Sequence, residues 1–249
     1  MCLIVVGWRV HPDFPLIVAA NRDEFHARPT AFASRWSDAP HVIGGRDLEA
    51  GGTWLGVTDT GRFAAVTNVR EPGMAKGART RGELTASFLR SDLGAGQFAQ
   101  TIKGSDYSGF NLLLADDDDL YYASNRDGET RPLAPGVYGM SNHLLDTPWP
   151  KLIKARHRFA EALSALPDET AFFELLADRH IEADEQLPNT GVSIEWERIL
   201  SAVFVSTADY GTRASTLLLR DANGRVRLHE KSFGAHGRPL QSSVISTSV

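Results

Sequence analysis

The sequence predicts an α+β fold in which helices cover antiparallel β-sheets. Short apolar runs occur in pairs around turn-forming residues, which is typical of β-hairpins. Segments of helical composition separate these pairs and do not alternate with single strands, so a parallel βαβ sheet is disfavoured. No Pro-, Ser- or Gly-rich linker divides the 249 residues, and we therefore expect a single domain over residues 1–249.

The first part of the chain predicts two strand pairs. Residues 2–8 and 16–20 are apolar runs on either side of a proline-containing breaker, and both are expected to be buried strands. Residues 53–57 and 63–67 form a second pair around Asp59-Thr60-Gly61. The intervening glycine-rich stretch, residues 44–53, lacks the Gly-x-x-x-x-Gly-Lys-Ser/Thr phosphate-loop pattern and is expected to be a flexible loop that borders a pocket.

The rest of the chain predicts helices between further strands. The best helix covers residues 150–166, because Pro150 suits a first turn and apolar residues repeat there at intervals of three or four. Shorter helices are expected at residues 82–89, 95–103 and 168–177. The remaining strands are expected at residues 110–115, 120–123, 203–205, 215–220 and 226–230.

Composition and charge narrow the classes of function. The formal net charge of -5 and the absence of a Lys/Arg-rich run argue against a nucleic-acid partner. The apolar run at residues 2–7 is too short to span a bilayer, so no transmembrane segment is expected and a cytoplasmic location is favoured. Four adjacent aspartates, residues 116–119, lack the pattern of a calcium loop and are interpreted as a solvated turn, so no metal site is expected.

Cys2 is the single cysteine, which excludes an intramolecular disulfide and a multi-cysteine zinc site. Methionine aminopeptidases remove Met1 when the second residue is small, and this would place a free α-amine beside the thiol. The amine titrates at about 7.7–8.0 and the thiol at about 8.5, so the amine can act as the base for its own side chain. A small, buried structural cysteine remains the alternative interpretation of this residue.

Polar residues end several of the predicted strands. Arg22 and Asp23 follow the second strand, where Arg22 could lower the pKa of the thiol and Asp23 could orient an α-ammonium group. Asn68 and Asn142 could donate hydrogen bonds to an oxyanion, or could equally be turn and helix-entry residues. Arg213 could bind a carboxylate or form a structural ion pair.

Eight short motifs spread over nearly the whole chain carry a specific resemblance to a known family. They are Met1-Cys2-Leu3-Ile4, Asn21-Arg22-Asp23-Glu24, Gly51-Gly52-Thr53-Trp54-Leu55-Gly56, Thr67-Asn68, Gly109-Phe110-Asn111-Leu112, Ser141-Asn142, Pro148-Trp149-Pro150-Lys151 and Tyr210-Gly211-Thr212-Arg213. The chain resembles the NRDE family, also called the transport and Golgi organisation protein 2 family. That family is similar in turn to N-terminal-nucleophile (Ntn) hydrolases of the choloylglycine hydrolase and penicillin V acylase group.

This resemblance implies an αββα sandwich of two antiparallel sheets covered by helices. It implies that Cys2 is the nucleophile, that Asp23 supports its amine, that Asn68 and Asn142 form the oxyanion hole, and that Arg213 is the late active-site arginine. In those hydrolases the early active-site arginine stands three residues before the aspartate, which is the position of Ala20 here. Because neighbouring strand residues point to opposite faces, Arg22 and Asp23 need not enter the same pocket, and the direction of the Arg22 side chain is left open. The substrate-binding residues expected in or next to these motifs are Asn21, Arg22, Glu24 and Arg70.

Two functional hypotheses remain open. The first is an N-terminal cysteine hydrolase that cleaves a C–N amide bond of a small acylated molecule and needs no cofactor. The second, which follows from the association of the NRDE family with Golgi organisation and intracellular haem handling, is a carrier that uses the same pocket for haem or another lipophilic ligand. The candidate haem ligands are His143, His157, His180 and Cys2, although no Cys-x-x-Cys-His haem-attachment motif occurs.

Overall fold

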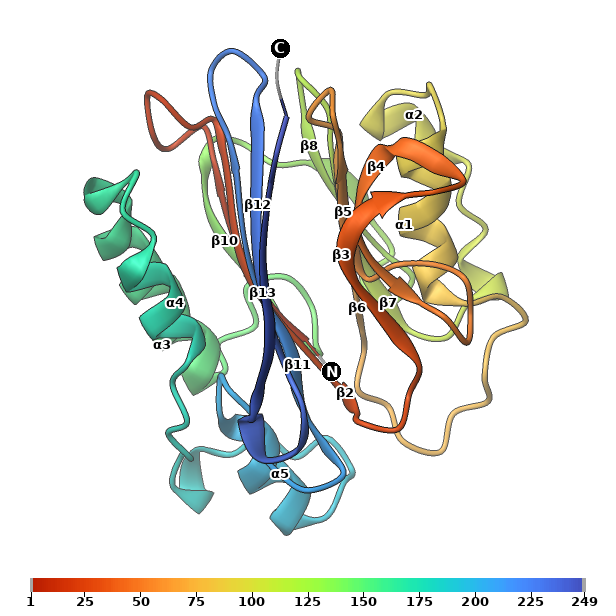
Figure 1. Cartoon of the computed structure of the whole chain (residues 1–249). Coiled ribbons are helices and arrows are strands. Elements are labelled where there is room, and N and C mark those ends of the chain that lie inside the picture. Colours follow the sequence, from red (N-terminus) through yellow and green to blue (C-terminus); the bar gives the residue numbers. More distant parts are fainter. Residues whose placement is uncertain (1, 248–249) are drawn as a thin grey trace.

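The computed structural model describes residues 2–247 as two antiparallel β-sheets packed face to face between layers of helices (Figure 1). The first sheet has the strand order β10-β1-β2-β11-β12-β13, and the second has the order β3-β4-β5-β6-β7-β8-β9. Helices α3 and α4 lie against the first sheet, whereas α1 and α2 lie against the second (Figure 1). The predicted αββα sandwich is confirmed.

The described chain starts in the first sheet, in the strand next to the edge strand β10. Its strands are β10 (Gly136–Met140), β1 (Cys2–Trp8), β2 (Leu16–Phe25), β11 (Tyr210–Arg220), β12 (Val226–Phe233) and β13 (Pro239–Ser246). Helices α3 (Pro150–Ala162) and α4 (Thr170–Leu176) cover its outer face, and α5 (Ile194–Ser201) lies beyond one end of its strands (Figure 1).

The second sheet is built almost entirely from consecutive hairpins. Its strands are β3 (Thr30–Trp36), β4 (Ala39–Asp47), β5 (Leu55–Thr58), β6 (Phe63–Asn68), β7 (Phe110–Ala115), β8 (Leu120–Ser124) and β9 (Thr130–Pro132). Its outer face is covered by α1 (Arg81–Arg90) and α2 (Ala95–Gln100), which bury Leu84, Phe88 and Phe98.

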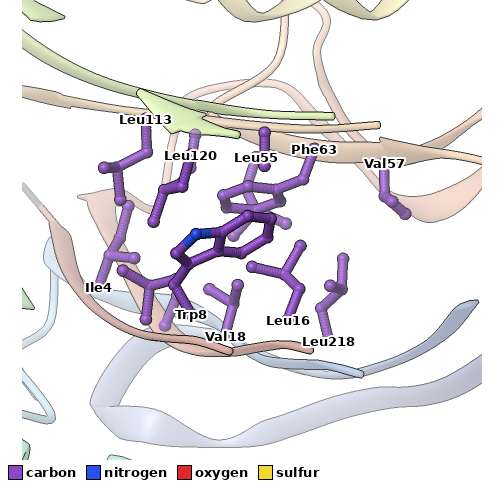
Figure 2. Packing of buried hydrophobic residues seen from close by; sticks show 14 of the residues in the cluster. Ile4, Trp8, Leu16, Val18, Leu55, Val57, Phe63, Leu113, Leu120 and Leu218 are labelled. Carbon is purple, nitrogen blue, oxygen red and sulfur yellow. The ribbon is translucent and has the colours of Figure 1, made fainter. Parts of the chain in front are cut away.

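Strand alternation divides β1 between two cores. Its even-numbered residues, such as Ile4 and Trp8, belong to the apolar cluster between the sheets. Its odd-numbered residues Leu3 and Val5 pack toward α3 and α4 in a separate cluster. Figure 2 shows the Trp8 indole among apolar side chains of both sheets. The same alternation therefore assigns each side chain near Cys2 to the inter-sheet face or to the helix face.

The structure corrects several predicted elements. Residues 44 and 45, expected in a loop, lie within β4, where a Cβ atom on Gly44 would stand 2.7 Å from the carbonyl oxygen of Leu55. These glycines therefore allow close backbone approach inside a strand. Residues 203–205 are not a strand, and the helix predicted to reach residue 166 ends as an α-helix at Ala162. The prediction also missed β3, β4, β9, β10, β13 and α5.

Candidate functional site

Cys2 lies at the beginning of β1, where its side chain faces a cavity of about 500 Å³. It stands directly opposite Arg22 in the antiparallel β1–β2 ladder, so both side chains project from the inter-sheet face. Arg22 lines the same cavity and is only 7% exposed. The direction of the Arg22 side chain, which the sequence left open, is toward the cavity: Arg22 shares the face of Cys2, whereas the Asp23 carboxylate is on the opposite face.

The cavity lies between the ends of the two sheets and is lined mainly by polar and charged residues. From the first sheet come Cys2, Arg22 and Arg213, and from the second sheet and its connections come Asn68 and Arg81. Part of the wall comes from the end of β4 and the following turn, so the glycine-rich stretch does border the pocket; the residues are Gly45, Arg46, Asp47, Glu49 and Ala50. None of the residues lining the cavity is a histidine, among those that the structure describes.

Asp23 borders the cavity, but its carboxylate is held on the helix face of the sheet. Its Oδ1 accepts a hydrogen bond from the Thr212 hydroxyl at 2.7 Å, and its backbone oxygen accepts one from the Tyr210 hydroxyl at 3.2 Å. Burial raises the pKa of the Asp23 carboxyl, while the positive charge of Lys151 and the hydrogen bond from Thr212 lower it. The Asp23 carboxylate therefore lies on the helix face of the sheet, whereas the Cys2 thiol lies on the inter-sheet face.

Asn68 and Asn142 are brought together beside β1, the strand that begins with Cys2. The Asn142 amide donates to Oδ1 of Asn68 at 2.9 Å, and the Ser141 hydroxyl donates to the backbone oxygen of Cys2 at 3.0 Å. Asn68 lines the cavity, whereas Asn142 is fully buried behind it and is not part of the cavity wall. The two residues form one connected unit, in which Asn142 supports Asn68 from behind.

Arg213 reaches the cavity from β11. Its Nη1 donates to the backbone oxygens of Phe25 at 2.9 Å and Arg28 at 3.1 Å, so it ties down the turn between β2 and β3. Glu24 also lines the cavity, and its carboxylate stands 3.9 Å from a guanidinium nitrogen of Arg22. Arg213, Arg22 and Glu24 are thus gathered at one site, and Arg213 has a clear structural role there as well.

Two residues expected to bind substrate lie outside the cavity. Asn21 is fully buried on the helix face, where its amide donates to the backbone oxygens of Leu176 and Val203 and its Oδ1 accepts the Ser215 hydroxyl. Because each polar group of its side chain is engaged, Asn21 joins β2 to the helical layer. Arg70 forms a buried ion pair with Glu197, at 2.7 Å, next to α3 and α5.

Three charged residues near the cavity were not predicted from the sequence. Arg81, in the first turn of α1, lines the cavity, and no motif or strand end pointed to it. Glu230 lines the cavity from β12 and accepts the backbone N–H of Ala33, which links the two sheets. Lys151 is buried in the first turn of α3; it belongs to the Pro148-Trp149-Pro150-Lys151 motif, although nothing in that motif indicated a role.

Electrostatics determine the chemistry available to Cys2. Burial raises the pKa of its thiol, the negative charge of Asp23 raises it further, and the positive charge of Arg22 lowers it. The thiol therefore needs a base to become a nucleophile near neutral pH. Since no described histidine lines the cavity, the arrangement contains no Cys–His pair for that purpose.

The histidines considered as haem ligands lie away from the cavity. His143 contacts the Thr147 hydroxyl at 2.9 Å, and the side chains of His157 and His180 are 75% and 57% exposed beside Glu161 and Glu182. None of the three lines the cavity that holds Cys2. Within residues 2–247, no group of three or more His, Cys, Asp or Glu side chains is arranged to hold a metal ion.

Comparison of the sequence with family models gives a match over residues 1–235 to the family described as "Transport and Golgi organisation 2". The chain belongs to the transport and Golgi organisation 2 family. It is 41% identical over 260 residues to the transport and Golgi organization protein 2 homolog of Bos taurus, with 94% of this chain and 93% of the relative covered. The Homo sapiens homolog is 38% identical over 259 residues, with the same coverage of both chains.

Solved structures extend the comparison to the fold of this family member. An N-acylethanolamine-hydrolyzing acid amidase ortholog of Caenorhabditis elegans superposes with a TM-score of 0.53 at 12% identity, covering 88% of this chain and 92% of that chain. The C2A mutant of a conjugated bile acid hydrolase from Clostridium perfringens gives 0.55 at 8% identity, with 98% and 92% covered. Both share the Ntn-hydrolase fold, and at these identities the likeness concerns the fold alone.

None of the helices within residues 2–247 is long and apolar enough to cross a membrane.

Proposed function

We propose that this protein is an N-terminal cysteine hydrolase that cleaves the C–N amide bond of a small acylated molecule. The observation that carries this proposal is the position of Cys2. Its thiol faces a polar cavity beside Arg22, in an Ntn-hydrolase fold, and no described histidine lines that cavity to serve as a base. After removal of Met1, the α-amine of Cys2 itself would supply the missing base.

The proposed reaction has two steps. In the first, the amine accepts the thiol proton while the sulfur attacks the amide carbonyl, and the resulting oxyanion accepts hydrogen bonds from the side chain or backbone of Asn68. The ammonium group then returns the proton to the departing amine, which leaves an acyl thioester on Cys2. In the second step, water attacks the thioester with help from the same α-amine, and the carboxylic acid and the thiol are released.

The dimensions and lining of the cavity support a small substrate with polar groups. A volume of about 500 Å³ lies in the range typical of small-molecule sites. The two structural neighbours are described as an N-acylethanolamine-hydrolyzing acid amidase and a conjugated bile acid hydrolase. The C2A mutation of the bile acid hydrolase also indicates a cysteine at the second position of that protein.

The direct test is amide hydrolysis by the wild-type protein and a Cys2→Ala variant, purified in the same way without a tag ahead of Met1. A panel of N-acyl amides that differ in acyl length and amine is incubated with each, and release of free acid is followed by mass spectrometry. Hydrolysis of at least one amide should be lost in Cys2→Ala, while a Cys2→Ser variant retains a trace. Equal hydrolysis by wild type and Cys2→Ala contradicts the proposal, as does a saturable haem Soret change without turnover of any amide.

A further inference from the structure

The ammonium group of Lys151 is buried directly behind the candidate site. Lys151 occupies the first turn of α3 and is 4% exposed, and its Nζ donates a hydrogen bond to the backbone oxygen of Leu200 at 2.7 Å. This is the single hydrogen bond of that ammonium group among the described residues, although the group has three donors. A buried ammonium group is costly unless an opposite charge lies nearby, so Lys151 requires an electrostatic partner.

Among the charges that act on Lys151, the negative charge of Asp23 has the largest effect on its pKa. Arg70 and Glu197, which line the same space as Lys151, form a buried ion pair at 2.7 Å. The other oxygen of Glu197 accepts hydrogen bonds from the backbone and the hydroxyl of Thr190, at 2.8 and 2.6 Å. Glu197 is therefore engaged by Arg70 and Thr190, and the carboxylate that acts most strongly on Lys151 is that of Asp23.

Strand alternation explains why these two charges share one side of the sheet. Asp23 has the same parity in β2 as Asn21, which contacts the helical layer, so its carboxylate lies on the face that α3 covers. Burial lowers the pKa of Lys151 to about 8, whereas the negative charge of Asp23 opposes that decrease. The Lys151 charge in turn lowers the pKa of the Asp23 carboxyl, which burial raises.

We propose that Lys151 is a positioning residue, which acts by keeping Asp23 ionised so that the Asp23 carboxylate can hold the α-ammonium group of Cys2. This inference rests on the proposed function, because it requires Cys2 to carry a free amine. Lys151 does not touch the reacting atoms. It supplies the positive charge that allows an anion to persist behind Cys2, and that anion determines how readily the α-amine takes up the proton of the thiol.

Other charged and titratable groups surround the pair on every side. Arg22 and Glu24 adjoin Asp23 along β2, the Cys2 thiol lies on β1, and Tyr210 approaches from β11. Arg70, Glu182 and Glu197 line the space beside Lys151. All of these groups remain in a Lys151 variant, so a change in titration on loss of Lys151 measures the contribution of its charge.

The single cysteine allows a direct measurement without any substrate. Protein labelled with [13Cα,13Cβ]cysteine gives one Cα signal, which follows ionisation of the α-amine, and one Cβ signal, which follows the thiol. In Lys151→Met, a larger share of the Asp23 carboxyl should be neutral, because burial raises its pKa and the charge of Lys151 no longer opposes that increase. The α-ammonium group loses part of its counter-charge, and the midpoint of the Cα titration should fall by about one pH unit.

Matched variants separate this effect from a change in packing. Lys154→Met removes a half-exposed lysine of the same helix, paired with Asp178, and should leave the midpoint unchanged. Lys151→Arg keeps the charge and should restore a midpoint close to wild type, and Lys151→Gln provides a second neutral variant with a polar side chain. In an Asp23→Asn background, Lys151→Met should produce no additional shift, because the proposed route passes through Asp23.

The outcomes distinguish failure of this inference from failure of the proposed function. If the Cα signal titrates in wild type and has the same midpoint in Lys151→Met, the role of Lys151 is overturned and the hydrolase proposal remains intact. A full shift that persists in the Asp23→Asn background also overturns it, because Lys151 would then act independently of Asp23. A wild-type Cα signal that does not titrate, with Met1 retained by intact mass, overturns both proposals.

Discussion

Cys2 and Arg22 are direct partners in the β1–β2 ladder, and both side chains face the cavity between the sheets. The next residue, Asp23, has its carboxylate on the opposite face, hydrogen-bonded to Thr212. Strand β2 therefore presents the Arg22 guanidinium group on the face of the thiol and the Asp23 carboxylate on the helix face. This division allows a nucleophile and its base to be controlled by different charges, although both belong to one residue in the proposed function.

Loss of Arg22 should raise the pKa of the Cys2 thiol further, because Arg22 is the cation on the same face that lowers it. In Arg22→Gln, we expect the pH profile of Cys2 alkylation by iodoacetamide to move upward by about one unit. Arg35→Gln, which alters an exposed arginine beside Asp59, is the matched control and should leave the profile unchanged. A profile in Arg22→Gln identical to wild type would show that the two side chains are not electrostatically coupled.

Asn142→Ala should reduce kcat for a hydrolysed amide by about a hundredfold with little change in KM. Asn68 would lose the side-chain amide that positions it. An oxyanion donor stabilises mainly the transition state, so its displacement lowers kcat more than it changes substrate binding. Steady-state kinetics measure this effect. Asn223→Ala, in an exposed turn, is the control. Unchanged kcat in Asn142→Ala, with the fold preserved by circular dichroism, would remove the Asn68–Asn142 unit from the oxyanion hole.

Glu230 should make stability depend on pH. Burial raises the pKa of its carboxyl in the folded state, so the folded protein binds this proton more tightly than the unfolded chain. Its contribution to stability is therefore full below the unfolded pKa and is lost as pH rises through the folded pKa. Glu230→Gln should flatten this decline and raise Tm relative to wild type at neutral pH but not at acidic pH, as measured by thermal unfolding. A Tm difference that does not change with pH would contradict this assignment.

The inter-sheet core should depend strongly on Trp8, whose indole is 2% exposed and contacts both sheets (Figure 2). Trp8→Ala should lower the free energy of unfolding by about 3–5 kcal/mol, measured in urea, because it leaves a large cavity. Trp196→Ala, at a position that is 38% exposed, should cost much less. Similar losses in the two variants would contradict the described packing.

The residues near Cys2 show which parts of the structure could be predicted from sequence. The β1–β2 hairpin was predictable because two apolar runs flank a proline-containing turn, and the polar residues at the end of β2 marked the position of the site. The strands β3 and β4 were missed because they carry exposed polar residues, Pro40 and a pair of glycines, and are maintained by contacts with other strands.

The burial of Lys151 could not be predicted, because it depends on how α3 docks against the first sheet and against the distant carbonyl of Leu200. A lysine in a first helical turn is normally exposed, and local sequence does not indicate which side of α3 faces Asp23. Likewise, polar strand ends predicted Asn142 as an oxyanion donor, whereas its position behind Asn68 follows from pairing between segments that are 74 residues apart.

The most direct test of the central claim is intact-mass and peptide analysis of untagged protein, quenched with acid shortly after mixing with a hydrolysed amide. We expect a protein that lacks Met1 and carries the acyl group of the substrate as a thioester on Cys2. The adduct should appear and decay at rates consistent with turnover and should be absent from Cys2→Ala. Turnover of the amide by protein that retains Met1, or an acyl adduct on a residue other than Cys2, would contradict an N-terminal cysteine nucleophile.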